Sequence, residues 1–284
     1  RGGVHRPFDW KGFVAIVLFM PLTIYALARG NSPANHEGWA SPTVIACFAV
    51  AAAAFAFFIV TELRNPAPLL QIRLLGERNF GVSMAVLTLF AVGMLGGTYL
   101  LPLYMQRGLG YTALMAGSVF LPVGLIQGVL SAVSGYMTRY VKPLLLVVAG
   151  ILVMALSFWL ASRFTLHTTH RHILFVLYLR GLGMGLTFAP LNLFSLKNLT
   201  QEDMAAAAGI SNSIKQLAGS FGIAILTAVL AARTAYHTAH ETLPAAQTYV
   251  EGVTDALSVV VWLTLASAVP LVWVLLRRKK QVKN

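Results

Sequence analysis

The chain has few charged residues for its length. Of its 284 residues, 11% are charged and 57% are hydrophobic, whereas a soluble domain carries about 25% charged residues. The mean hydropathy is +0.74. This composition excludes an ordinary soluble domain and indicates an all-α polytopic membrane protein.

Cysteine and acidic residues are also scarce. Cys47 is the only cysteine and lies within an apolar run, which excludes an intramolecular disulfide and a cysteine-based metal site. The nine acids all fall in predicted loops or at the ends of apolar segments, so we expect no carboxylate inside the membrane to carry a proton. They are Asp9, Glu37, Glu62, Glu77, Glu202, Asp203, Glu241, Glu251 and Asp255.

Eight apolar segments are long enough to cross a membrane, at about twenty residues each. They lie near 12–29, 42–61, 80–104, 113–137, 143–162, 172–195, 207–232 and 255–276. Prolines within them predict kinks, which membrane helices tolerate; these are Pro21, Pro102, Pro122, Pro190 and Pro270. The chain begins at Arg1 without a signal-peptide pattern, so we expect a fragment or a processed segment.

The net charge of +12 is explained by membrane topology rather than by nucleic-acid binding. With eight spans, both termini lie on one side of the membrane. That side holds fourteen of the 21 Lys and Arg residues, the other side holds five, and two lie within spans. Because positive charge concentrates on the inner side, we expect both termini in the cytoplasm and no nucleic-acid partner.

The sequence predicts three regions. Residues 1–78 contain two spans and a long cytoplasmic link. From Pro68 onward this link alternates apolar and charged residues, which predicts a short amphipathic helix on the inner membrane surface. Residues 79–276 contain six spans and are expected to form one bundle, and residues 277–284 form a basic cytoplasmic tail.

Two cations, Arg180 and Lys215, lie deep inside predicted spans. A cation at the centre of a membrane helix costs about 2.5 kcal/mol or more, so it should face protein or water. Around Lys215, small and polar residues recur every three or four positions and form one helical face that we expect to line a cavity. That face contains Ala208, Ser211, Asn212, Lys215, Gly219 and Gly222.

Each cation has two possible roles. It could contact substrate or a partner carboxylate in a cavity wall, or it could bond backbone carbonyls or extend to the cytoplasmic surface. For the remaining candidate substrate-binding residues, the alternative is hydrogen bonding between helices. These residues are Gln127, Tyr99, Thr98, Asn192, Asn212 and Gln216. Three glycine pairs predict close helix packing, namely Gly93 with Gly97, Gly124 with Gly128, and Gly181 with Gly185.

Metal binding and catalysis find little support. Two histidine groups have spacings that can bind zinc at a helix end, but no cysteine or inward-facing acid completes either site, and we interpret them as solvated loop histidines. Intramembrane Ser, Asn and Lys residues lack a His or acid partner, so we expect no enzyme. The first histidine group contains His167, His170 and His172, and the second contains His237 and His240.

Four segments resemble a known family. FDWKGF (Asp9, Gly12), the link from Glu62 to Phe80, GYMTRYVK (from Gly135) and NSIKQLAGSFGIAI (from Asn212) resemble, in order and spacing, the C-terminal part of the EmrB/QacA-type drug:proton antiporters. These form the fourteen-span branch of the major facilitator superfamily. Three positions depart from the family pattern: Thr138 replaces Asp, Lys215 replaces Arg, and Ala218 replaces Gly.

The resemblance implies that the first two spans are an inserted hairpin and the last six are a C-terminal bundle built from two inverted three-span repeats. By this resemblance we expect the N-terminal bundle, with the family's proton-coupling acids, to be absent from this chain. The implied function is efflux of drugs or toxic small molecules across the bacterial inner membrane, driven by the proton gradient and without a cofactor. Candidate partners are lipid, the small-molecule substrate, the missing bundle and a periplasmic adaptor.

Two alternative functions stay open. One is a narrower exporter of a fatty acid, siderophore or other metabolite, and the other is a membrane fragment that does not transport. The substrate and the stoichiometry cannot be read from the sequence.

The charge distribution predicts which loops a membrane-impermeant thiol reagent can reach. Applied from outside, the reagent should modify cysteines placed at Asn35 or Gln247 and spare one placed at Glu77, because Glu77 lies in the predicted cytoplasmic link. Modification at Glu77 from outside would reverse the topology.

Overall fold

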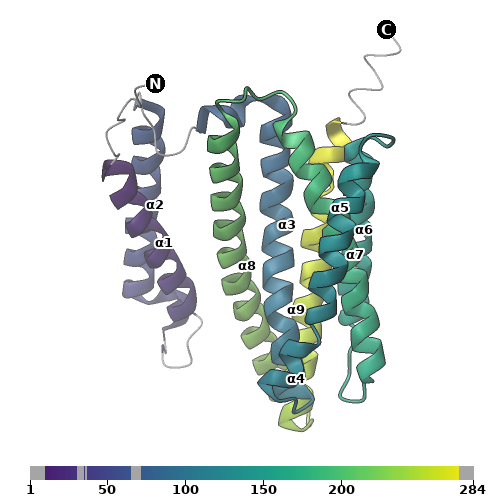
Figure 1. Ribbon diagram of the computed structural model, residues 1–284. Helices are drawn as coiled ribbons and strands as arrows, with labels where there is room; N and C mark the ends of the chain where they lie inside the picture. Colours follow the sequence, from purple (N-terminus) through teal and green to yellow (C-terminus); the bar gives the residue numbers. More distant parts are fainter. Residues whose placement is uncertain (1–9, 31–34, 36, 65–71, 275–284) are drawn as a thin grey trace. The chain divides into compact units, whose positions relative to one another are not determined.

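The structure is a computed structural model that describes residues 10–274 except 31–34, 36 and 65–71 (Figure 1). Eight helical spans in this part of the chain are long and apolar enough to cross a membrane. The prediction of an all-α polytopic membrane protein with eight spans is therefore confirmed. The chain divides into two compact units, 1–77 with 199–213 and 78–198 with 214–284.

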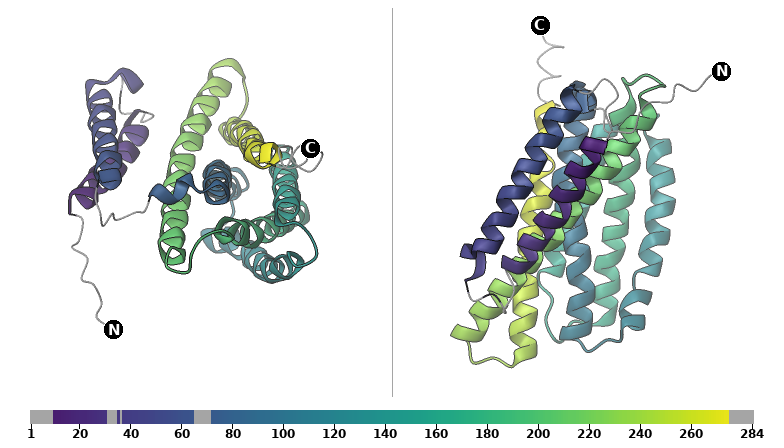
Figure 2. Two further views of the ribbon diagram at one scale, coloured as in Figure 1. Left: turned by 90° about the horizontal axis from the view of Figure 1, so that it is seen from above. Right: turned by 90° about the vertical axis from the view of Figure 1, so that its left-hand side faces the viewer.

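The first unit contains a pair of helices, α1 (Trp10–Gly30) and α2 (Pro42–Arg64), with a 3₁₀ turn at Gly38–Ala40 between them. The two helices lie side by side (Figures 1 and 2), and the rings of Phe19 and Phe55 are 4.8 Å apart. The predicted amphipathic helix starts in residues 65–71, which lie outside the described part; a 3₁₀ turn follows at Ile72–Gly76.

The second unit contains the remaining spans. Helix α3 runs directly into a π-helical turn, and a short helix α4 precedes α5. Helix α8 crosses the boundary between the units and belongs to the second unit from Ile214 onward. The bounds are α3 Arg78–Leu103, the π-helical turn Tyr104–Gly108, α4 Ala113–Ser118, α5 Leu121–Met137, α6 Pro143–Ala161, α7 His170–Leu196, α8 Met204–His240 and α9 Ala245–Ala266.

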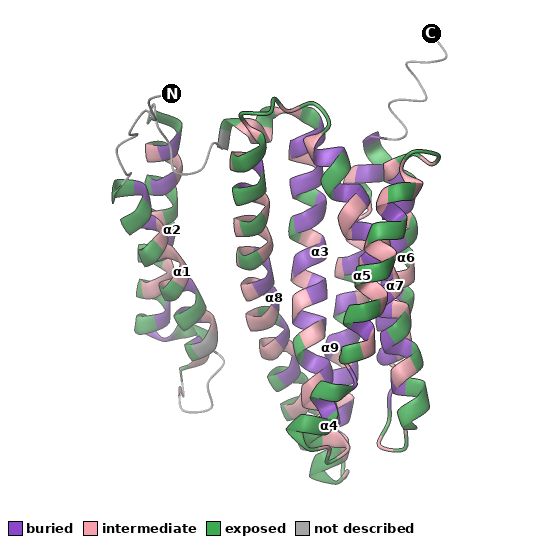
Figure 3. Cartoon of the chain, in the orientation of Figure 1, coloured by how far each residue is buried: buried purple, intermediate pink, exposed green. Residues whose placement is uncertain are grey.

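Helix α3 is the core of this unit. It packs against α7 and α9, while α7 also packs against α5 and α6. Buried residues concentrate on α3, whereas α5 is largely exposed (Figure 3). This exposure suits a helix that faces lipid or another protein segment, because apolar side chains need no cover within a bilayer.

Two of the three glycine pairs pack as predicted. A Cβ atom on Gly97 would lie 2.3 Å from the Phe158 ring, and one on Gly181 would lie 2.9 Å from the Val123 carbonyl oxygen on α5. Gly124 and Gly128 differ, because a Cβ on either would meet nothing within 4 Å in the described structure. Their predicted packing role is therefore not realised within this unit.

The polar face of α8 also differs from its prediction. A Cβ on Gly222 would lie 2.2 Å from the Val92 carbonyl oxygen, and one on Gly219 would lie 2.0 Å from the Leu95 side chain. The prediction that this whole face lines a cavity is wrong for these two glycines, because they form the contact between α8 and α3.

Helix α9 begins at Ala245, ten residues before the predicted span. Glu251 and Asp255 consequently lie inside a spanning segment, which runs to Val274, and the prediction that all acids lie in loops or at span ends is wrong for them. Among the prolines, Pro21, Pro102 and Pro190 lie inside helices as predicted. Pro122 instead occupies the first turn of α5, where proline is tolerated.

We predict that Gly222→Ala destabilises the bundle, because the new methyl group would collide with the α3 backbone. Gly128→Ala is the matched control, since it adds the same methyl group in open space and gains about 1 kcal/mol of helix propensity. Thermal unfolding in detergent should show a lower Tm for Gly222→Ala and an equal or higher Tm for Gly128→Ala. Equal effects would contradict the close contact between α8 and α3.

Candidate functional site

Arg180, on α7, is the most deeply placed charge of the bundle. Its side chain is 1% exposed and lies about 15 Å along the axis from the start of the helix. Its Nη2 donates to the Met94 carbonyl oxygen at 3.0 Å and to the Thr98 hydroxyl, both on α3. Its Cζ lies 4.9 Å from the centre of the Phe158 ring on α6. The guanidinium thereby connects three helices.

Thr98 is arranged to accept this hydrogen bond. Its hydroxyl donates to the Met94 carbonyl at 2.5 Å, so its lone pairs remain available to the guanidinium. The Nη1 atom of Arg180 has no hydrogen-bond partner among the described residues. The backbone contact with Met94 is the one expected if Arg180 acts as a structural cation.

Lys215, on α8, has a different environment. Its side chain is half-buried, and its Nζ lies 6.0 Å from the centre of the Phe188 ring, within the range of a cation–π interaction. Phe188 in turn packs edge-to-face on Phe90, with the ring centres 5.7 Å apart. A half-buried ammonium beside aromatic rings can bind an anionic or polar group, because its charge is only partly satisfied.

The other predicted site residues do not form a single cluster. Tyr99, on α3, is 43% exposed, while Gln127 on α5 is half-buried. Asn192, Asn212 and Gln216 are exposed. Of the eight predicted residues, the structure brings together Thr98 and Arg180, and it places Lys215 in a separate aromatic environment.

The bundle also has a wholly apolar surface hollow between α5 and α7. It is lined by Leu125, Ile126, Val129, Leu130 and Leu182, so it contains none of the predicted polar residues. Within the described residues, no group of three or more His, Cys, Asp or Glu side chains could hold a metal ion. The site chemistry therefore consists of embedded cations, hydroxyls and aromatic rings.

Sequence reasoning missed the aromatic partners of both cations. Phe158 and Phe188 lie within apolar runs, where a phenylalanine that faces a cation has the same sequence signature as one that faces lipid. It also missed that His237 and Asp255 are in contact, because the start of α9 was placed ten residues too late.

These features define a class of protein: a helical, multi-pass membrane protein with cations held inside one bundle. The family model of the Major Facilitator Superfamily matches residues 11–223. The chain belongs to this superfamily of transporters, which indicates transport rather than catalysis.

Several relatives share this similarity. The chain is 30% identical to the multidrug export protein EmrB of Escherichia coli (strain K12) over 239 residues, 84% of this chain and 46% of EmrB. It is 32% identical to the puromycin resistance protein pur8 of Streptomyces alboniger over 280 residues, 96% of this chain and 53% of that protein. It is 28% identical to the fatty acid resistance protein FarB of Neisseria gonorrhoeae, covering 82% of this chain and 46% of FarB.

The chain thus spans about half the length of the relatives it matches, and the match to EmrB is to its C-terminal part. The predicted resemblance to the C-terminal part of an EmrB-type transporter is confirmed.

We predict that Thr98→Val destabilises the bundle through Arg180. A hydrogen bond to a charged group contributes about 1.5–3 kcal/mol, and valine removes the acceptor while keeping the shape. In an Arg180→Met background, Thr98→Val should have little effect, because the donor is gone. Reversible unfolding in detergent measures both free energies.

The matched control for this comparison of the two backgrounds is Thr88→Val. The Thr88 hydroxyl donates a hydrogen bond to the Met84 carbonyl one turn earlier on the same helix, at 2.8 Å, and forms no hydrogen bond with a cation among the described residues. Its effect should be the same with or without Arg180. An equal loss for Thr98→Val in both backgrounds would show that Thr98 and Arg180 are not coupled.

Proposed function

We propose that this chain is the C-terminal part of a proton-driven exporter of drugs or other toxic small molecules. The main support is its similarity to proteins named for multidrug export and for resistance to puromycin and lincomycin. Members of this superfamily alternate access around a site between two bundles, and this chain supplies one six-helix bundle. The proposal involves no enzymatic activity and no cofactor.

Under this proposal, the chief partner of the bundle is an N-terminal six-helix bundle, supplied by the rest of the protein or by a second chain. Helix α5 supports such a partner, because Leu121, Leu125 and Val129 are 71%, 73% and 65% exposed beside the open glycines Gly124 and Gly128. A periplasmic adaptor protein is a further proposed partner, and lipid surrounds the bundle. The proposed location is the bacterial inner membrane, with both chain ends in the cytoplasm.

A narrower substrate class is the second candidate. The similarity to a fatty acid resistance protein and the half-buried Lys215 beside Phe188 both favour an amphiphile with a carboxylate. The Lys215 ammonium would attract the carboxylate of such a substrate, and the neighbouring aromatic rings would pack against the apolar part of the substrate. A cationic drug would need a compensating acid from the other bundle.

Transport by protein reconstituted in proteoliposomes tests the proposal. With a proton gradient, the chain joined to its N-terminal bundle should transport, while residues 1–284 alone should not. Lys215→Gln should raise the KM for an anionic substrate about tenfold or more, which corresponds to losing one charge-assisted hydrogen bond, and should affect a cationic dye less.

Lys197→Gln is the matched control, because Lys197 is exposed at the end of α7. It should leave transport of both substrates unchanged. Unaltered transport by Lys215→Gln would assign Lys215 a structural role. Proton-driven transport by residues 1–284 alone would refute the need for a second bundle, and failure of the joined protein to transport any tested substrate would favour the non-transporting alternative.

A further inference from the structure

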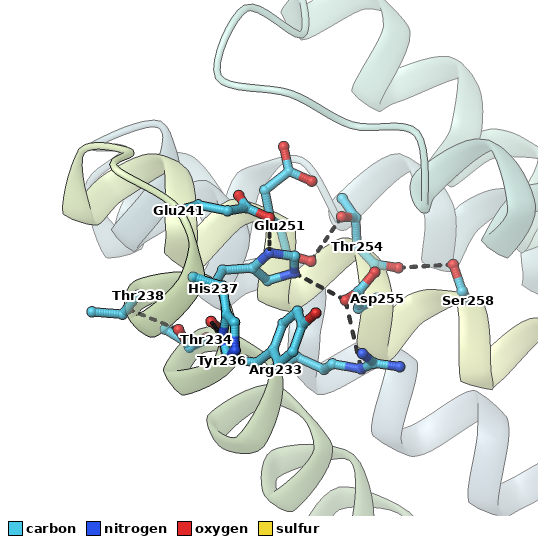
Figure 4. Close-up of polar contacts among 11 residues, drawn as sticks. Arg233, Thr234, Tyr236, His237, Thr238, Glu241, Glu251, Thr254, Asp255 and Ser258 are labelled. Carbon is cyan, nitrogen blue, oxygen red and sulfur yellow. Dashed lines mark hydrogen bonds and ion pairs between the residues drawn. The ribbon is translucent and has the colours of Figure 1, made fainter.

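The ends of α8 and α9 hold a compact group of titratable side chains that the proposed function does not use (Figure 4). His237, in the last turn of α8, lies between two acids. Its Nδ1 is 2.9 Å from Oε1 of Glu241, which directly follows the helix, and its Nε2 is 3.1 Å from Oδ2 of Asp255 on α9. The same Asp255 oxygen lies 3.6 Å from Nε of Arg233.

The two acids beside His237 favour its protonated form. A neutral imidazole has one N–H, and its other nitrogen is an acceptor. A carboxylate also accepts hydrogen bonds, so a neutral His237 can satisfy only one of its two neighbours. Protonated His237 donates to both. The side chain of His237 is only 13% exposed, which limits the water available to replace either bond.

The two helices are already in contact at this point. A Cβ on Gly252 of α9 would lie 2.3 Å from Oγ1 and 3.0 Å from the backbone nitrogen of Thr234 on α8. Thr234 and Gly252 each lie three residues, about one turn, before His237 and Asp255. The contact therefore brings His237 within reach of Asp255.

The remaining groups around His237 determine the local charge balance. On the α8 side these are Arg233, Tyr236, His240 and Glu241, and on the α9 side Glu251 and Asp255 (Figure 4). From the turn after α3, Arg107 lies 5.6 Å from the ring centre of Tyr249 on α9 rather than beside an acid. Without the imidazolium charge, Arg233 is the only cation among the described residues that forms an ion pair in this cluster, and its side chain is 54% exposed.

We propose that His237 is a proton-binding site that joins the end of α8 to α9. When it carries a proton taken from solvent, it bridges Glu241 and Asp255; when it returns that proton, one bridge is lost and Arg233 remains paired with Asp255 alone. The stabilisation is present at low pH and disappears as the pH rises through the titration of His237. This proposal concerns the chain itself and stands apart from any transport activity.

Spin-label distance measurements test this site in residues 1–284, reconstituted in lipid. Labels are attached to cysteines at Ala235 on α8 and Ala246 on α9, both exposed, in a Cys47→Ala background. Spectra are recorded at about pH 5 and about pH 8.5, on either side of the ordinary histidine value near 6.5. We expect a narrow, short-distance population at the lower pH and its loss at the higher pH.

Substitutions assign the response to His237. His237→Gln should lack the short-distance population at both pH values, His237→Arg should keep it at both, and Asp255→Asn should move the transition to lower pH. His240→Gln is the matched control: His240 lies three residues on, is exposed, and stacks on Tyr236 at 4.4 Å. It should behave like the unmodified chain.

Three results would overturn the proposal: a distance independent of pH in the unmodified chain, a pH response that persists in His237→Gln, or a response that disappears in His240→Gln. If His237→Gln does not fold, His237→Arg and Asp255→Asn decide the question. A pH-dependent distance in His237→Arg, or an unshifted transition in Asp255→Asn, would equally reject His237 as the proton-binding group.

Discussion

The structure depends on satisfying one buried cation inside an apolar bundle. A charge or hydrogen-bonding group left unpaired in such an environment costs several kcal/mol, so Arg180 requires acceptors from its neighbours. Met94 and Thr98 on α3 supply them, and Phe158 on α6 covers the guanidinium. The helices can approach closely enough because Gly97 faces the Phe158 ring. Gly97 and Arg180 therefore contribute to the same packing arrangement of α3, α6 and α7.

The two embedded cations differ in exposure, and this difference separates their roles. Arg180 is 1% exposed, so its side chain has almost no free surface to offer to a solute or to another bundle. Lys215 is half-buried and rests near an aromatic ring, which leaves part of its charge available. Of the two, Lys215 is the better candidate for contact with substrate, and Arg180 for holding the bundle in shape.

Composition and periodicity predicted the eight spans because apolar length is a strong signal. They could not predict packing partners, since spacing alone does not identify what a residue faces. Gly181 with Gly185 and Gly124 with Gly128 have the same spacing, yet only the first pair packs on a neighbouring helix. The start of α9 was missed because its first turns carry Thr248, Glu251 and Thr254, whose polarity resembles that of a loop.

The early start of α9, at Ala245, places Asp255 where it can take part in a response to protons. Asp255 was expected at the very start of the last span, where a carboxylate would be close to solvent and of little structural effect. Placed inside α9 beside His237, it forms part of the proposed proton-binding site, whose net charge changes when the histidine gains or loses a proton. Arg180 offers no such change, since a guanidinium stays protonated. Proton sensitivity in this bundle is therefore most readily placed at the contact between α8 and α9, away from the cations at its centre.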